Sequence, residues 1–81
     1  MSIVFSKKLY EIHCNALGEK HPDTLESLRE LAMVYGELGD YQKAFELIEK
    51  VYFLYCEIFG EKHPKTIKTR ECFEEYRKKT Q

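Results

Sequence analysis

This chain of 81 residues has no long apolar run, almost no net charge and few residues that break helices. No apolar stretch approaches the about 20 residues that span a bilayer. A formal net charge of −1 provides no bulk attraction to nucleic acid or to an acidic membrane. The N-terminus also lacks the pattern of a signal peptide, so we expect a cytoplasmic protein. With two prolines and four glycines, the composition is that of an ordinary globular domain.

The chain has few cysteines, and they are far apart in the sequence. The three cysteines are Cys14, Cys56 and Cys72, an odd number with no short paired spacing. That pattern argues against a disulfide framework and against a zinc site. We therefore expect half-buried thiols in a reducing compartment, with no metal and no cofactor.

Catalytic motifs are missing as well. The sequence contains no nucleophile with a plausible base, no glycine-rich phosphate loop and no zinc-protease spacing. Its many acidic residues are distributed as they are on solvated helix faces. We therefore expect that the chain is not an enzyme.

The sequence contains one seven-residue motif twice, which we call the repeated phrase. Residues 18–24 read Gly-Glu-Lys-His-Pro-Asp-Thr, and residues 60–66 repeat them 42 positions later with one change, Asp23 to Lys65. Self-similarity at a fixed period of this size marks a repeat architecture. His21 and His63 could be metal ligands, but no further ligand accompanies either, so a structural role in a linker is favoured.

Apolar periodicity predicts four helices around these linkers and no strand. Helices are expected over residues 3–17, from 22 up to Gly39, over 41–59 and over 64–79, with glycine ending and proline starting them at the repeated phrase. The fold class is therefore all-α. We expect one domain over residues 1–81, made of a half repeat (1–17), a full repeat (22–59) and a half repeat or capping helix (64–79). The last helix is apolar on one side only, as a capping helix is.

The middle of the chain resembles the tetratricopeptide repeat. The motif residues, in the family's order and spacing, are Leu28, Leu31, Ala32, Tyr35, Gly39, Asp40, Tyr41 and Ala44. The period of 42 exceeds the usual length of about 34 residues, and is similar to the long-period variety of kinesin light chains and nephrocystin-like proteins. The resemblance implies antiparallel helix-turn-helix repeats wound into a right-handed superhelix, an α-solenoid.

The resemblance also implies a non-enzymatic scaffold that binds a protein or peptide partner in a concave groove lined by the first helix of each repeat. Carried over by repeat position, the groove residues are Glu26, Arg29, Glu30, Met33, Glu37, Lys68, Glu71, Cys72, Glu75 and Lys79. The chain departs from the family in two ways. It lacks the Asn pairs with which light-chain-like repeats hold a peptide backbone, and it lacks the Lys and Asn clamp for a terminal carboxylate.

The first helix suggests an alternative function. In the repeat scheme its own partner helix is missing, so an apolar face is left open, and such faces serve association. The residues available for a homodimer or larger oligomer are Ile3, Val4, Phe5 and Tyr10. The other explanation of this face is that the chain is a fragment of a longer array.

Overall fold

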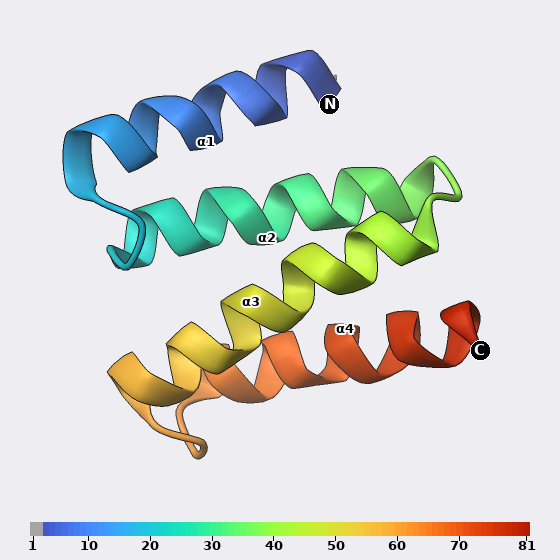
Figure 1. Ribbon diagram of the computed structural model, residues 1–81. Helices are drawn as coiled ribbons and strands as arrows, with labels where there is room; N and C mark the ends of the chain where they lie inside the picture. The colour runs from blue at the N-terminus through green and yellow to red at the C-terminus, as the bar shows by residue number, and fades with distance from the viewer. Residues whose placement is uncertain (1–2) are drawn as a thin grey trace.

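The computed structural model describes residues 3–81, and each regular element in that range is an α helix. The helices are α1 (Ile3–Leu17), α2 (Pro22–Glu37), α3 (Tyr41–Phe59) and α4 (Pro64–Thr80), as Figure 1 shows. The all-α prediction is confirmed, with the helices close to their expected ranges and no strand within 3–81. Residues 1–2 of the expected first half repeat lie outside the described residues.

The repeated phrase forms the two joints between α1 and α2 and between α3 and α4. Gly18 and Gly60 both have a φ of +90°, a left-handed conformation that favours glycine and ends the preceding helix. His21 and His63 are N-caps, and the Nδ1 atom of each accepts a hydrogen bond of 3.1 Å from the backbone N–H two residues later. A proline follows each histidine in the first helical turn. Both histidines therefore shape helix starts.

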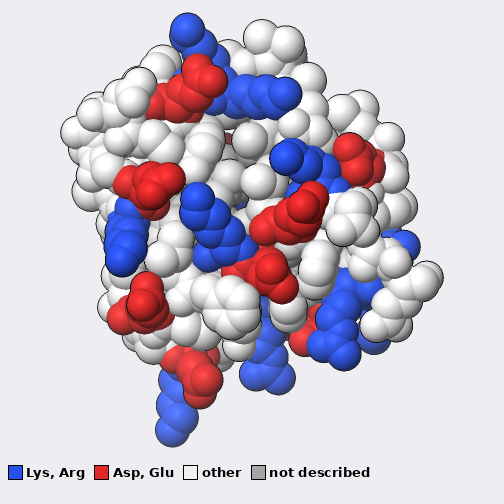
Figure 2. All heavy atoms as spheres, viewed as in Figure 1, with Lys and Arg blue, Asp and Glu red and all other residues white. Residues whose placement is uncertain are grey.

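The helices stack in chain order as a thin slab (Figure 1). Each helix packs chiefly on its neighbours in sequence, and the Cα atoms extend over 35 × 32 × 15 Å. Packing mainly between helices that are neighbours in sequence is typical of repeat proteins. Basic and acidic side chains are interspersed over the face seen in Figure 2.

The hydrophobic core lies between α2 and α3. Five buried residues form one cluster: Leu25, Leu28, Leu31, Val51 and Tyr55. Ala32 and Ala44 are both 0% exposed, as expected of the small residues that let α2 and α3 approach closely. The tetratricopeptide-like spacing thus marked core positions correctly.

Aromatic rings join α3 to α4. The Phe73 ring is stacked 5.2 Å from the Phe45 ring and 5.4 Å from the Tyr52 ring, measured between centroids. Ring stacking of this kind adds to the stabilisation from burial. α4 is therefore held against α3 by aromatic rings on its inner side.

Candidate binding groove

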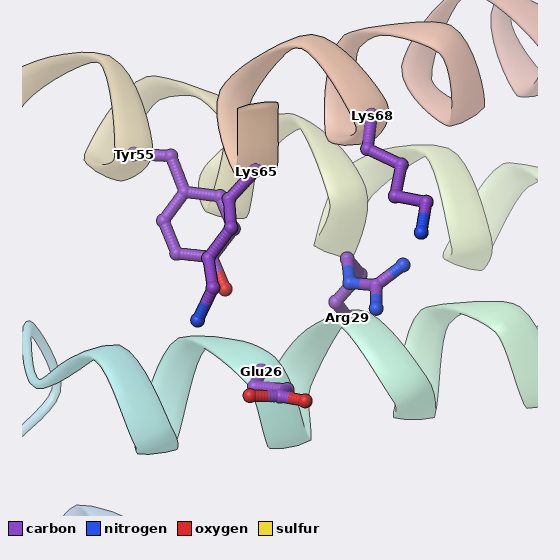
Figure 3. A pocket seen from close by; sticks show the side chains of 5 residues that line it. All are labelled: Glu26, Arg29, Tyr55, Lys65 and Lys68. Carbon is purple, nitrogen blue, oxygen red and sulfur yellow. The ribbon is translucent and has the colours of Figure 1, made fainter. Parts of the chain in front are cut away.

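A hollow opens between the starts of α2 and α4, and we call it the basic hollow. It has a volume of about 220 Å³. Its lining residues come from three helices (Figure 3): Glu26 and Arg29 of α2, Tyr55 of α3, and Lys65 and Lys68 of α4. The Lys68 side chain descends from α4 toward the Arg29 guanidinium, and Tyr55 lies between the two helices (Figure 3).

Short polar side chains fix the wall and the floor of the basic hollow. The Thr66 hydroxyl donates to the backbone carbonyl oxygen of Tyr55 at 3.4 Å, which ties the start of α4 to α3. Thr69 donates to the carbonyl oxygen of Lys65 at 2.8 Å. Both threonines are buried, and Tyr55 is only 1% exposed. The basic side chains therefore project from a backbone that is firmly anchored.

The charges around the basic hollow do not balance. Arg29, Lys65 and Lys68 face a single carboxylate, Glu26. Within residues 3–81, the ion pairs join Lys50 to Glu19, Arg77 to Glu74 and Lys79 to Glu75, so none involves the three cations. The Arg29 guanidinium contacts the Met33 sulfur at 3.8 Å, and the Lys65 ammonium lies 5.9 Å from the centre of the Phe59 ring. The hollow keeps an excess of positive charge.

The Arg29 charge acts on both α3 and α4. Burial raises the pKa of the Tyr55 phenol, and the Arg29 charge opposes that rise. Burial also raises the pKa of the Cys72 thiol, and Arg29 again acts in the opposite direction. The Arg29 guanidinium thus lies close enough to affect the ionisation of both groups, while the Glu26 and Asp23 carboxylates act on Tyr55 in the opposite direction.

The Tyr76 side chain of α4 packs against Gly36 of α2. A Cβ atom at Gly36 would lie only 2.7 Å from the Tyr76 hydroxyl oxygen, so the missing side chain makes room for the Tyr76 ring. Glycine inside a helix costs stability relative to alanine, and here the close approach explains it. The Tyr76 ring thus fills space between α2 and α4 beside Gly36.

The structure distributes the expected groove residues over several hollows. Glu26, Arg29 and Lys68 line the basic hollow. Three others line a shallow hollow of about 190 Å³ along α2: Glu30, Met33 and Glu37. Glu71 lines a more open hollow on α4 beside Lys68. Glu75 pairs with Lys79 at 3.6 Å, and Lys79 also covers the Tyr41 ring.

Two lining residues were missed by sequence reasoning, Tyr55 and Lys65. Tyr55 belongs to α3, and by repeat position α3 is expected to lie behind the helices that line the groove. Its ring nevertheless reaches into the gap between α2 and α4 (Figure 3). A signal for Lys65 was present, because it is the single difference between the two copies of the repeated phrase.

A hollow at the repeat-equivalent place between α1 and α2 has the opposite charge. It is about 310 Å³ in volume and contains Asp23, Glu26 and Glu30, with His13 at the position that Tyr55 occupies one repeat later. His13 is half-buried and hydrogen-bonds through Nδ1 to the Ser27 hydroxyl. The same location is therefore acidic in one repeat and basic in the next.

A family model for the tetratricopeptide repeat matches residues 2–57. This chain belongs to the tetratricopeptide repeat family. Tetratricopeptide repeats generally mediate protein–protein interaction and are typically non-enzymatic scaffold modules. Comparison with curated proteins and with solved structures found no significant match.

In tetratricopeptide terms, α2 and α3 form one helix pair. α4 (Pro64–Thr80) lies beyond the matched residues, and the basic hollow separates it from α2. Within residues 3–81, no three side chains of His, Cys, Asp or Glu gather as a metal site would require. None of the described helices is long and apolar enough to cross a membrane.

The residues of α1 that were expected to self-associate lie in two different environments. Ile3 and Tyr10 pack against the core cluster of the tetratricopeptide fold. Val4 is 72% exposed and Phe5 is 56% exposed. Ile12 of the same helix, which was not among the expected residues, is 51% exposed. The most exposed large apolar side chains of α1 are therefore Val4, Phe5 and Ile12.

Proposed function

We propose that this chain is a non-enzymatic interaction module that binds a peptide or a partner helix in the groove between α2 and α4. The observation that carries the proposal is the basic hollow, which opens between α2 and α4 and is lined from three helices. By repeat position α2 and α4 correspond to successive first helices, which line the binding groove that the family resemblance implies. We also assign the chain to the long-period variety of the family, on its 42-residue period.

The groove residues have complementary roles in this proposal. The charged residues orient the partner, and Met33, which is 37% exposed, offers a flexible apolar contact beside them. The binding residues are Glu26, Arg29, Glu30, Met33, Glu37, Lys68, Glu71 and Glu75, together with Tyr55 and Lys65.

Site-specific photo-crosslinking tests the groove. A photoreactive amino acid at Met33 reports on the groove, and the same group at Phe53, which is 58% exposed on α3, serves as the matched control. We expect a partner protein to be crosslinked from position 33 and not from position 53. Equal crosslinking from both positions, or none from position 33, contradicts the proposal.

A second candidate function is self-assembly through α1. The exposed apolar side chains of Val4, Phe5 and Ile12 support it, because exposed apolar patches commonly mark association sites. In this case Ile3 and Tyr10 support the surface from within. Light scattering at micromolar concentration would find a dimer that Phe5→Glu dissociates and Phe53→Glu does not. A monomeric wild-type chain contradicts this candidate.

A further inference from the structure

The start of α4 carries basic residues where its repeat counterpart carries acidic ones. Lys65 and Lys68 stand 42 residues after Asp23 and Glu26. The positive end of the helix dipole favours an acidic residue in the first turn and disfavours Lys65. Lys68 lies three positions later on the same face, so the two ammonium groups also repel each other. Both lysines are exposed, and helix formation does not require them.

Arg29 adds a third cation from the opposite wall. Among the residues that line the hollow, Arg29, Lys65 and Lys68 carry three positive charges against the single negative charge of Glu26. Glu71 lies beside the two lysines in the adjoining hollow on α4. No ion pair among the described residues neutralises any of the three. A local arrangement that disfavours the folded chain and converges on one hollow is typical of a binding site.

We propose that the basic hollow receives a phosphorylated side chain of the peptide bound in the groove. This inference rests on the proposed groove function and names the chemistry of its ligand. A phosphate monoester carries about −1.5 to −2 charges at pH 7, which matches the excess of positive charge in the hollow. A carboxylate would leave part of that excess unpaired.

The lining groups suit the phosphate oxygens. A guanidinium can donate two parallel hydrogen bonds to a phosphate, and each ammonium supplies further donors. The Tyr55 hydroxyl lies in the gap between α2 and α4 (Figure 3) and adds a neutral donor at the floor. A phosphate in the hollow would also lie beside the start of α4, where the helix dipole favours an anion.

The test uses the full chain, labelled with ¹⁵N, and three small probes at pH 7 and fixed ionic strength. The probes are the N-acetyl methylamides of phosphoserine, glutamate and serine. We expect phosphoserine to cause saturable chemical-shift changes in the first turn of α4 and around Arg29. Its affinity should exceed that of glutamate by at least about fivefold because of its additional charge, and serine should cause no shifts. Absence of a saturable response to phosphoserine, or equal affinity for glutamate, overturns the proposal.

Charge variants decide whether the hollow itself binds the phosphate. Lys65→Asp/Lys68→Glu installs the residues that α2 carries at the same repeat positions, so the helix should form and the phosphoserine shifts should disappear. The matched control, Lys20→Asp/Lys43→Glu, changes net charge equally at exposed positions outside the hollow and should bind as the wild type does. Equal loss in both variants would reveal attraction to net charge alone and would overturn the proposal.

The outcomes separate this inference from the groove function. If crosslinking from position 33 captures a partner but phosphoserine does not bind, the groove function stands and the phosphate site is wrong. If phosphoserine binds but position 33 captures no partner, the hollow is an anion site outside a peptide groove, and the groove function fails.

Discussion

The starts of α2 and α4 have the same backbone construction and opposite charges. In both, a histidine caps the helix, a proline follows it, and a buried threonine donates to a carbonyl oxygen of the preceding helix, at 3.2 Å from Thr24 and 3.4 Å from Thr66. Asp23 of α2 is replaced by Lys65 in α4. The repeated residues make the joint, and the residues that differ between the repeats give each joint its own surface.

The same two helices also differ on the side that packs toward a following helix. That side of α2 is covered by α3, and Ala32 within it is fully buried. The corresponding side of α4 faces solvent. The residues of α4 that stand at the positions of Leu28, Ala32 and Tyr35 are Arg70, Glu74 and Arg77. A helix can therefore keep the repeat's joint while giving up its apolar outer face.

The largest effect on stability is expected from exchanging Ala32 and Glu74, which occupy equivalent repeat positions. Ala32→Glu would force a longer side chain and a carboxylate into the contact between α2 and α3. Overpacking and an unpaired buried charge together should cost more than about 4 kcal/mol in the free energy of unfolding. Circular dichroism during urea unfolding would measure the loss, and we expect most of the cooperative transition to disappear.

Glu74→Ala is the reciprocal exchange and the control. It removes a half-exposed carboxylate and its ion pair with Arg77 at 3.8 Å, so the free energy of unfolding should change by less than about 0.5 kcal/mol. If the two exchanges had similar effects, α4 would be packed on its outer side as α2 is, and its description as a capping helix would be wrong.

The residues at the floors of the two hollows can be exchanged in the same way. Tyr55→His replaces a fully buried ring by a smaller polar one, with an expected loss of about 2–3 kcal/mol. His13→Tyr changes a half-buried residue and forfeits the hydrogen bond to Ser27, so its cost should stay below about 1 kcal/mol. Urea unfolding of both variants compares them, and a larger loss for His13→Tyr would contradict this ranking.

Much of the fold could be predicted because helix periodicity and joint chemistry are local. Glycine and proline fixed the helix ends, and the spacing around Ala32 and Ala44 marked fully buried positions on α2 and α3. The histidine caps could not be specified, because histidine is not among the preferred N-cap residues and its bond depends on the path of the linker.

The site was harder to predict because it depends on how three helices meet. Repeat position placed Glu26, Arg29 and Lys68 on the groove side, but the reach of Tyr55 through the gap depends on the helix crossing. The surface of α1 was divided for a similar reason. Sequence spacing alone could not separate Tyr10, which packs inward, from Phe5, which is exposed.

A moderate effect is expected from reversing single charges in the first helical turns. Lys65→Asp should raise the free energy of unfolding by about 0.5–1.5 kcal/mol, because it places an anion at the positive end of the helix dipole. Asp23→Lys should lower it by a similar amount. Thermal unfolding at low and high salt would measure both changes, and salt should shrink them. If both variants changed the free energy of unfolding in the same direction, the charge of the first-turn residue would not act in the same way at the starts of α2 and α4.

The smallest effect on stability at neutral pH is expected from replacing Tyr10 or Tyr52 by phenylalanine. The two tyrosines are equivalent in the repeat and lie beside Cys14 and Cys56. Burial, reinforced by the Cys14 thiol, raises the pKa of Tyr10 to about 12, and the Cys56 thiol raises the pKa of Tyr52. Because the folded pKa of Tyr10 lies above the unfolded value of about 10, the folded chain holds the phenol proton more tightly. Its contribution to stability is therefore fully present below pH 10 and is lost as the pH rises through about 12. We expect Tyr10→Phe to change stability little at pH 7 and to lessen the alkaline loss, with a smaller gain for Tyr52→Phe. Urea unfolding from pH 8 to pH 12 under reducing conditions measures these differences, and an unchanged alkaline loss in Tyr10→Phe would show that Tyr10 ionises as freely in the folded chain as in the unfolded one.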